Sequence, residues 1–425
     1  MQVSLHPNRN IWSSILERPV FDASKLEEIV KPVLANIKAN GDKALKEYAQ
    51  KFDGVTLESL IVSEDEINKA KDLVSVELKE AIAVAEANIK KFHKAQFSPI
   101  ERIETTKGVT CWRETRAIEA VGLYIPGGTA PLFSTVLMLV IPAQVAGCQN
   151  IVLSTPPNKE GKVHPAILYT ANKLGVTKII KSGGAQAIAA MAYGTESVPK
   201  TYKIFGPGNQ YVTSAKQLVS KDGVAIDMPA GPSEVAVWAD IKANAEFVAS
   251  DLLSQAEHGV DSQVILVTTS KELVEKVNKA VESQLKTLSR KEIAEKALLN
   301  SKSIVLSSDD EIIDLLNQYA PEHLILQTEN YSEMIPKIIN AGSVFLGPYT
   351  PESAGDYASG TNHTLPTNGY AMAYSGVSLD SFVKKITFQE ITKEGIKSLG
   401  KHIEIMAQEE QLDAHKNAVT LRIND

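Results

Sequence analysis

AVGLYIPGGTAP (residues 120–131) decides the fold class, because a short run of strand-forming residues leads directly into a glycine-rich turn. Helical patterns separate it from further runs of the same kind. The further runs are NIVLS (150–154), KIIKS (178–182), KIFGPG (203–208) and GVAIDM (223–228). Because strands that alternate with helices form parallel sheets covered by helices, this part of the chain is predicted to be one α/β unit.

A second series of strand-like runs predicts another α/β unit directly after the first. Its members are VAVWA (235–239), QVILVTT (263–269), SIVLSS (303–308), HLILQ (323–327) and SVFLG (343–347). Apolar residues at helical spacing fill residues 22–97, and the region after residue 375 is mixed and helical. The predicted fold class is therefore α/β, with two incomplete Rossmann-like domains and helical regions at both ends.

Length, charge and cysteine content exclude several classes of protein. A chain of 425 residues is too long for one simple core and predicts two or three domains. The formal net charge is −7 and no basic stripe occurs, so nucleic-acid binding is not expected, because phosphate contacts need clustered Lys and Arg. Two cysteines, Cys111 and Cys148, form neither a disulfide framework nor a thiolate zinc site.

The hydrophobic pattern indicates neither export nor a membrane span. The N-terminal residues MQVSLHPNRNIWSS lack the apolar run of a signal peptide. The longest apolar stretch, 132–148, is interrupted by polar residues and is short for a membrane span, so a buried helix is predicted there. We therefore expect a cytoplasmic protein that does not bind membranes.

Glycine-rich turns in and after the first unit indicate a phosphorylated cofactor. They are YIPGGTAP (124–131), KSGGAQA (181–187), FGPGN (205–209) and PAGPSE (229–234). In open α/β sheets, ligands bind beyond the carboxyl ends of the strands, where glycine lets backbone amides approach a phosphate. The turns contain no G-x-G-x-x-G fingerprint, so a nicotinamide cofactor would have to bind in a variant manner.

Several segments combine imidazole with carboxylate or amide side chains. They are SAGDYASGTNHT (353–364), SQAEHG (254–259), APEHL (320–324) and EEQLDAHKNAV (409–419). The first has no large aliphatic residue and is predicted to be a loop. The second is predicted to end a helix, with Gln255 and His258 on one face and Gly259 as the helix stop. Each segment alone is equally typical of a solvated loop or helix end.

Together these segments supply ligands suited to a divalent metal ion. The candidate ligands are Gln255, His258, His323, Asp356, His363 and His415, with Glu322 and Glu410 beside them. Nitrogen and oxygen ligands without thiolates suit zinc in a site that is open to substrate. The sequence has neither H-E-x-x-H nor His-x-His, so the ligands would have to converge from distant segments. Glu322 and His323, at a predicted strand start, suit proton transfer because the pKa of imidazole lies near neutrality.

The motifs SQAEHG, APEHL, SAGDYASGTNHTLPT, GLYIPGG, GPGN and LDAHKNAV occur together, and the combination resembles the histidinol dehydrogenase family. The resemblance extends from about residue 20 to residue 420. It implies oxidation of L-histidinol through L-histidinal to L-histidine, the last step of histidine biosynthesis, with NAD and one zinc ion per subunit. It also implies a homodimer in which the C-terminal segment of each subunit completes the site of the other.

The same resemblance implies a role for each site residue. The zinc ligands would be Gln255, His258, Asp356 and His415, and Glu322 and His323 would be the catalytic pair. Substrate would contact Ser233, Gln255, His258, His323, Asp356, His363, Glu410 and His415. The NAD cofactor would contact Tyr124, Gln186 and Asn209. Both His415 and Glu410 would cross the subunit interface.

The resemblance also implies a domain organisation. Residues 1–20 would form an N-terminal arm, 21–118 a helical region packed on the second α/β unit, 119–233 the NAD-binding domain, 234–375 the substrate and metal domain, and 376–425 a C-terminal dimerisation tail.

We hypothesise that His323 removes the hydroxyl proton of histidinol while hydride leaves for NAD, and that it acts again on the hydrated aldehyde. Glu322 would take a proton from the water that hydrates the aldehyde. A thiohemiacetal on Cys111 or Cys148 is a rival mechanism, but neither thiol has a basic neighbour in sequence. A zinc hydrolase that uses Glu322 to activate water, and a non-catalytic metal or ligand-binding protein, are the rival functions.

Overall fold

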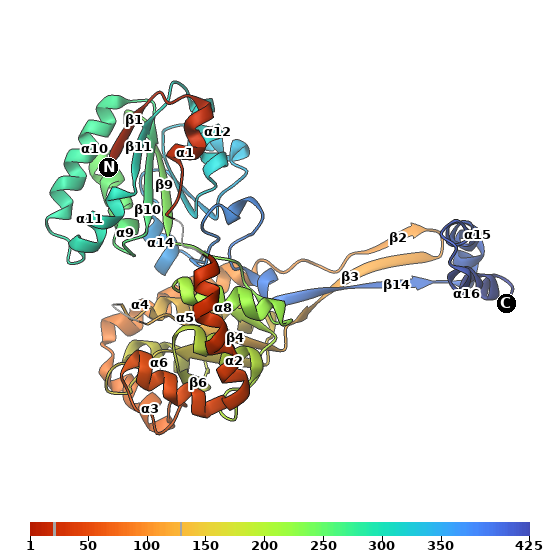
Figure 1. Cartoon of the computed structure of the whole chain (residues 1–425). Coiled ribbons are helices and arrows are strands. Elements are labelled where there is room, and N and C mark those ends of the chain that lie inside the picture. Colours follow the sequence, from red (N-terminus) through yellow and green to blue (C-terminus); the bar gives the residue numbers. More distant parts are fainter. Residues whose placement is uncertain (20–22, 128–129) are drawn as a thin grey trace.

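The computed structural model describes residues 1–19, 23–127 and 130–425, which form two α/β units and a long projecting arm (Figure 1). The boundary expected near residue 20 lies outside the described residues, and so do residues 128 and 129 of the turn 124–131. Within the described ranges, no helix is both long and apolar enough to cross a membrane.

The first unit is built on a parallel sheet, as the alternating pattern predicted. Its strands lie in the order β6-β5-β4-β7-β8. They are β4 (Ala120–Tyr124), β5 (Asn150–Thr155), β6 (Ile179–Lys181), β7 (Lys203–Phe205) and β8 (Ala225–Ile226). The strand order reverses between β4 and β7, which is where open sheets of this kind leave a crevice at the carboxyl ends of the strands.

The second unit has the same connectivity, although no sequence repeat is evident. Its strands lie in the order β1-β11-β10-β9-β12-β13, and neighbouring strands are parallel. They are β1 (Gln2–Leu5), β9 (Glu234–Ala239), β10 (Gln263–Thr268), β11 (Lys302–Val305), β12 (His323–Gln327) and β13 (Ser343–Leu346). The order reverses between β9 and β12, and β1 adds a strand from the N-terminal arm at the edge.

Helices cover both faces of the first sheet. They are α2 (Ala23–Tyr48), α3 (Glu64–Leu73), α4 (Val76–Lys94), α5 (Phe133–Ala146), α6 (Pro165–Lys173), α7 (Gly184–Tyr193) and α8 (Gln210–Lys221). The expectation that the region 21–118 packs on the second unit is wrong, because α2 packs on α7 and α8, α3 on α6, and α4 on α5. The physical reason is clearest at α5, which is buried on all sides from Ser134 to Ala143 and therefore needs α4 as an outer cover.

The second sheet is also covered on both faces. The helices α9 (Ala245–Ala256), α10 (Lys271–Leu285) and α11 (Lys291–Leu299) form one core with it. The opposite core contains α12 (Asp309–Tyr319), α13 (Tyr331–Met334) and the short α1 (Trp12–Ile15), whose Trp12 is buried. The N-terminal arm is thus part of the second unit. The short helices are η1 (Arg9–Ile11), η2 (Ala49–Asp53), η3 (Ile335–Lys337), α14 (Glu352–Tyr357), η4 (Tyr370–Met372) and η5 (Leu379–Phe382).

The projecting arm combines two segments that are far apart in the sequence (Figure 1). Its antiparallel sheet has the order β14-β3-β2, and β3 pairs with β14 along its whole length. The elements are β2 (Arg102–Thr106), β3 (Val109–Ala117), β14 (Val383–Ile391), α15 (Lys393–Glu409) and α16 (Asp413–Ile423). The C-terminal region is therefore a long strand followed by a helix pair at the tip of the arm.

Candidate active site

A cavity of about 560 Å³ collects most of the predicted site residues, and we call it the interdomain cavity. The second unit contributes Ser233, Gln255, His258, Glu322, His323, Asp356 and His363 to its wall. The first unit contributes residues near the ends of β4 and β7 and the start of α5, including Asn209 and Thr135. The tertiary structure thus brings together side chains from both units at one cavity.

The two sheets face this cavity with opposite ends of their strands. In the first unit, Pro126 and Asn209 follow the carboxyl ends of β4 and β7, where open sheets bind ligands. In the second unit, Ser233 precedes β9 and His323 is the first residue of β12, so the amino ends of the strands face the cavity. The prediction that Glu322 and His323 lie at a strand start is confirmed.

His323 is oriented by a main-chain carbonyl and a carboxylate. Its Nδ1 lies 3.2 Å from the carbonyl oxygen of Glu234, and because a carbonyl only accepts, Nδ1 carries a proton. Its Nε2 lies 3.5 Å from Oδ1 of Asp356. Burial opposes a charge on His323, but the carboxylates of Glu322 and Asp356 raise its pKa well above the ordinary value. The imidazole therefore has a strong affinity for a proton.

Glu322 is buried directly beside this imidazole. Its Oε2 accepts a hydrogen bond from the main-chain N–H of Glu234 at 2.9 Å, and it lies 3.6 Å from Nδ1 of His323. The pair therefore places a carboxylate and an imidazole, two different proton acceptors, at one wall of the cavity.

The segment 353–364 is only partly the predicted loop, because α14 extends to Tyr357. Glu352 lies in the first turn of α14, and burial raises the pKa of its carboxyl to about 8. Asp356, in the last turn, lines the cavity. Burial would raise the pKa of Asp356, but a hydrogen bond from His323 and the nearby imidazoles lower it, so this carboxylate is ionised.

His363 is held as a neutral imidazole. Its Nδ1 donates to the main-chain oxygen of Asp356 at 2.9 Å, and its Nε2 lies 3.1 Å from the hydroxyl of Thr135, which donates to it. Burial lowers the pKa of His363. This side chain therefore joins α5 of the first unit to the segment after α14 of the second.

Gln255 and His258 lie at the end of α9, but Gly259 is not the helix stop. The helix ends at Ala256, and Gly259 does not adopt a left-handed conformation. The hydrogen-bond network assigns the Gln255 amide nitrogen to the carboxylate of Glu352, at 3.1 and 3.3 Å from its oxygens. In this arrangement Glu352 takes the amide nitrogen, so a cation would have to bind to the amide oxygen of Gln255.

The residues of one chain fit part of a zinc site. Gln255, His258 and Asp356 offer an amide oxygen, an imidazole and an ionised carboxylate on one cavity. Within residues 1–19, 23–127 and 130–425, no three His, Cys, Asp or Glu side chains form a metal-binding group on their own.

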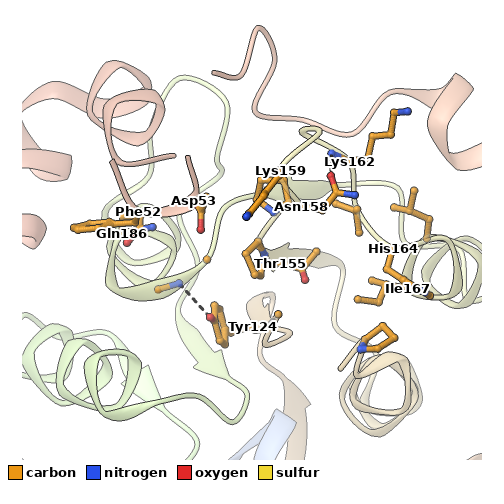
Figure 2. Close-up of a pocket in the computed structure, with 18 of the residues that line it drawn as sticks. Phe52, Asp53, Tyr124, Thr155, Asn158, Lys159, Lys162, His164, Ile167 and Gln186 are labelled. Carbon is orange, nitrogen blue, oxygen red and sulfur yellow. Dashed lines mark hydrogen bonds between the residues drawn. The ribbon is translucent and has the colours of Figure 1, made fainter. Parts of the chain in front are cut away.

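A larger cavity of about 1340 Å³ lies at the carboxyl ends of the first sheet, and we call it the cofactor cavity (Figure 2). Tyr124, Gln186 and Asn209 line it, as do Lys159 and Lys162. The Tyr124 hydroxyl accepts a hydrogen bond from the N–H of Gly184 at 3.1 Å, and burial raises its pKa to about 12. Asn209 caps α8 and lines both cavities, so a ligand can extend from one cavity to the other.

Comparisons with known proteins agree with this geometry. The family model described as histidinol dehydrogenase matches residues 16–423. The chain belongs to the histidinol dehydrogenase family. The histidinol dehydrogenase of Bacteroides thetaiotaomicron is 62% identical over 424 residues, covering 100% of this chain and 99% of that protein. The Escherichia coli K12 protein of that name is 55% identical over 413 residues, covering 96% and 94%.

A solved structure gives the same result for the fold. The crystal structure of histidinol dehydrogenase from Elizabethkingia anophelis has a TM-score of 0.98 and 59% identity, and the match covers 100% of this chain and 98% of that one. Membership of the histidinol dehydrogenase family makes this protein an oxidoreductase that acts on a CH–OH group, with histidinol as its substrate, in histidine biosynthesis.

Two residues that the resemblance to histidinol dehydrogenase assigned to the site are not near the cavities of the same chain. Glu410 directly follows α15 and His415 lies on α16, and both are exposed. These helices form the tip of the arm, far from both units (Figure 1). Within one subunit, neither side chain reaches Asp356.

Sequence reasoning missed several residues of this histidinol dehydrogenase fold. Glu234 and Glu352 have buried carboxyl groups and contact predicted site residues. In the sequence, Glu234 looks like an ordinary strand start and Glu352 like an ordinary helix start. Asp53, from η2, lines the same cavity as Gln186 (Figure 2). Burial raises the pKa of Asp53 to about 6, and its Oδ2 has no hydrogen-bond partner in the described chain. These residues share no local motif that would have shown their role.

The two cysteines of this chain do not line either cavity. Cys111 lies on β3, and Cys148 is buried after α5. Neither residue is among those that line the two cavities. Burial raises the pKa of Cys148 to about 11, which keeps it protonated near neutral pH. A thiohemiacetal mechanism therefore has no support here.

Proposed function

We propose that the protein oxidises L-histidinol through L-histidinal to L-histidine, using NAD and one zinc ion per subunit. The observation that carries this proposal is that three predicted metal ligands and the Glu322–His323 pair line one cavity, which shares Asn209 with a larger cavity. The larger cavity has room for a dinucleotide at the strand ends where such ligands bind.

Zinc would be held by Gln255, His258 and Asp356, together with His415 of the partner subunit. A zinc ion held by these residues would supply a fixed point for the nitrogen atoms of histidinol, and His323 on the same cavity wall would then lie within reach of the carbinol. Glu352 holds the Gln255 amide, and His363 holds the main chain at Asp356, so the ligands are oriented in advance.

His323 acts as the base in the first oxidation. Its Nδ1 is occupied by the Glu234 carbonyl, so the proton of the substrate hydroxyl transfers to Nε2. The hydride of the carbinol carbon leaves toward Asn209, where the two cavities meet. A cation on Asp356 would weaken the pull of that carboxylate on His323 and so lower the pKa of the imidazole toward neutrality.

Glu322 acts between the two oxidations. The aldehyde must gain water before it can lose a second hydride, and the Glu322 carboxylate takes a proton from that water. His323 then removes a proton from the hydrate as the second hydride leaves. His323 thus serves both oxidations, and Glu322 serves the hydration between them.

We also propose a homodimer in which the arm supplies Glu410 and His415 to the partner subunit. The arm presents apolar side chains that are exposed in a single chain: Ile386, Ile391, Ile405, Met406, Leu412 and Leu421. Exposed apolar surface of this kind is typical of an interface. Because both cysteines are free, we further propose a reducing location, the cytoplasm.

Metal analysis of the purified protein and an absorbance assay for NADH formation together test the proposal. The purified protein should contain one zinc per subunit and should form NADH when histidinol and NAD are added. Chelation should abolish NADH formation, and added zinc should restore it. Zinc-free protein that remains fully active, or metal-loaded protein that forms no NADH, would contradict the proposal.

A further inference from the structure

We infer that Arg18 and Glu234 are positioning residues, which hold the main chain that orients both Glu322 and His323. This inference rests on the proposed function, because it takes those two residues as the catalytic pair. Arg18 lies in the N-terminal arm, 216 residues before Glu234 in the sequence.

Glu234 is the first residue of β9, and its main chain contacts both members of the pair. Its N–H donates to Oε2 of Glu322 at 2.9 Å. Its carbonyl oxygen accepts from Nδ1 of His323 at 3.2 Å. One peptide segment therefore determines where the carboxylate lies and which nitrogen of the imidazole remains available as a base.

The side chain of Glu234 fixes that segment in place. Its Oε1 accepts from Nε of Arg18 at 2.6 Å and from the main-chain N–H of Asn368 at 2.7 Å. Its Oε2 accepts from Nη2 of Arg18 at 3.0 Å. Two parallel bonds from one guanidinium restrict both the position and the rotation of the carboxylate.

Arg18 is itself held from the other side. Its Nη2 also donates to the main-chain oxygen of Tyr319 at 2.5 Å, and its guanidinium carbon lies 4.0 Å from the centre of the Tyr319 ring. Tyr319 directly precedes Ala320, whose φ of +50° turns the chain into Pro321 and Glu322. Arg18 thus contacts the side chain of Glu234 and the main-chain segment that leads into Glu322 and His323.

The charges explain why Arg18 cannot be removed while Glu234 remains. The side chains of Glu234 and Arg18 are 2% and 15% exposed. Without Arg18, the Glu234 carboxylate would lie buried near the Glu322 carboxylate with no compensating charge. It would then have to take up a proton or move, and either change would shift the main chain that holds Glu322 and His323. Lysine cannot supply the two parallel bonds, so Arg18→Lys keeps the charge and loses the geometry.

The test compares Arg18→Lys and Arg18→Met with Arg9→Met as the matched control. Arg9 also lies in the N-terminal arm, but it forms an exposed ion pair with Asp314. Its removal should leave activity unchanged. We expect Arg18→Lys to lower kcat about 10- to 100-fold, with KM for histidinol and for NAD within about two-fold of the parent, because misplacement of a base by a fraction of an ångström acts on the chemical step. Bound zinc and the thermal midpoint of Arg18→Lys should remain close to those of the parent.

A double-mutant cycle separates positioning from general stability. If Arg18 acts through His323, then Arg18→Lys should cause no further loss of kcat in a His323→Asn background. The same fractional loss in both backgrounds, or a rise in KM with kcat unchanged, would overturn the inference. A parent protein that forms no NADH would instead overturn the proposed function. Should Arg18→Met fail to fold, Arg18→Lys still decides the question.

Discussion

At the scale of single residues, the site depends on how buried charges are paired. His323 is surrounded by carboxylates that raise its pKa, whereas His363 accepts from a hydroxyl and has a lowered pKa. Both imidazoles donate from Nδ1 to a main-chain carbonyl. The pKa values of the two imidazoles therefore differ because carboxylates lie on both sides of His323, Glu322 near its Nδ1 and Asp356 near its Nε2.

Substitution of the two proposed bases should separate the two oxidations. His323→Asn should slow the oxidation of both histidinol and histidinal by about 10²- to 10⁴-fold, because each oxidation needs that base. Glu322→Gln should slow chiefly the histidinal step. Stepwise rates with each substrate check this, and unimpaired histidinal oxidation by Glu322→Gln would remove the role assigned to Glu322.

Asp251 gives a pH-dependent stability test away from the chemistry. Its carboxyl accepts a hydrogen bond from Gln327 at 2.7 Å, and burial raises its pKa to about 6 from 3.8. A carboxyl whose pKa is higher in the folded state stabilises the fold at low pH, and this contribution is lost as pH rises from about 4 through 6. Asp251→Asn keeps an acceptor without the charge. From pH 4 to pH 7.5, the free energy of unfolding of the Asp251→Asn variant should therefore rise by about 1–3 kcal/mol relative to that of the parent.

Urea unfolding at pH 4.5 and at pH 7.5 measures this change. Glu282→Gln on the exposed side of α10 is the control, and its effect should be the same at both pH values. An Asp251→Asn effect that does not vary with pH would show that the carboxyl is not destabilised by burial.

At the scale of elements, the turn after β7 shows how a glycine shapes the cofactor cavity. Gly206 has a φ of +128°, and a Cβ there would collide with the main-chain oxygen of Tyr124. Its N–H donates to the buried Asp227 at 2.8 Å, and its carbonyl accepts from Lys216 at 3.0 Å. The close approach of β4 and this turn places Tyr124 and Asn209 at the same cavity.

Gly206→Ala should lower the free energy of unfolding by about 2–4 kcal/mol, because backbone strain and overpacking add. It should also weaken NAD binding, which titration of NAD into the variant measures. Gly54→Ala is the control, since Gly54 has a φ of +69° but no described atom within 4 Å of the added Cβ. Its cost should be about 1–2 kcal/mol, from strain alone. Equal costs at the two positions would contradict the argument from close contact.

At the scale of the whole molecule, the site lies where the strand ends of the two sheets face each other. Two sheets of the same connectivity meet at one cavity, the first with its carboxyl ends and the second with its amino ends. The arm carries Glu410 and His415 away from both units (Figure 1). A single chain therefore brings Glu322, His323 and three of the proposed metal ligands to one cavity, but not His415.

Mixed dimers test whether the site is shared between subunits. A His323→Asn subunit and a His415→Ala subunit should each form inactive homodimers. In a mixed dimer, the core of the His415→Ala subunit is intact and receives His415 from its partner, so one site of the two is complete. Purified mixed dimers should regain about half of the parent activity. No recovery would show that His415 acts within its own chain, and a fully active His415→Ala homodimer would show that His415 has no role.

Much of this protein could be predicted from short stretches of sequence. The strands of both units form where β-type runs occur, because alternation of strand and helix is a local pattern. The start of β12 at His323 could also be predicted from neighbouring residues, because APE precedes an apolar run. Helix periodicity in residues 22–97 showed that one face is buried, but it did not show against what, and this is why the packing partner was wrong.

The sequence by itself determined the two α/β units, the family and the residues that carry imidazole, amide and carboxylate groups. Only the tertiary structure decided that α2 to α4 cover the first unit, that Arg18 pairs with Glu234, and that His415 lies far from Asp356. The reason is physical. Propensity and periodicity act over a few neighbouring residues, whereas burial of a shared face or of a charge depends on partners that only folding brings within contact distance.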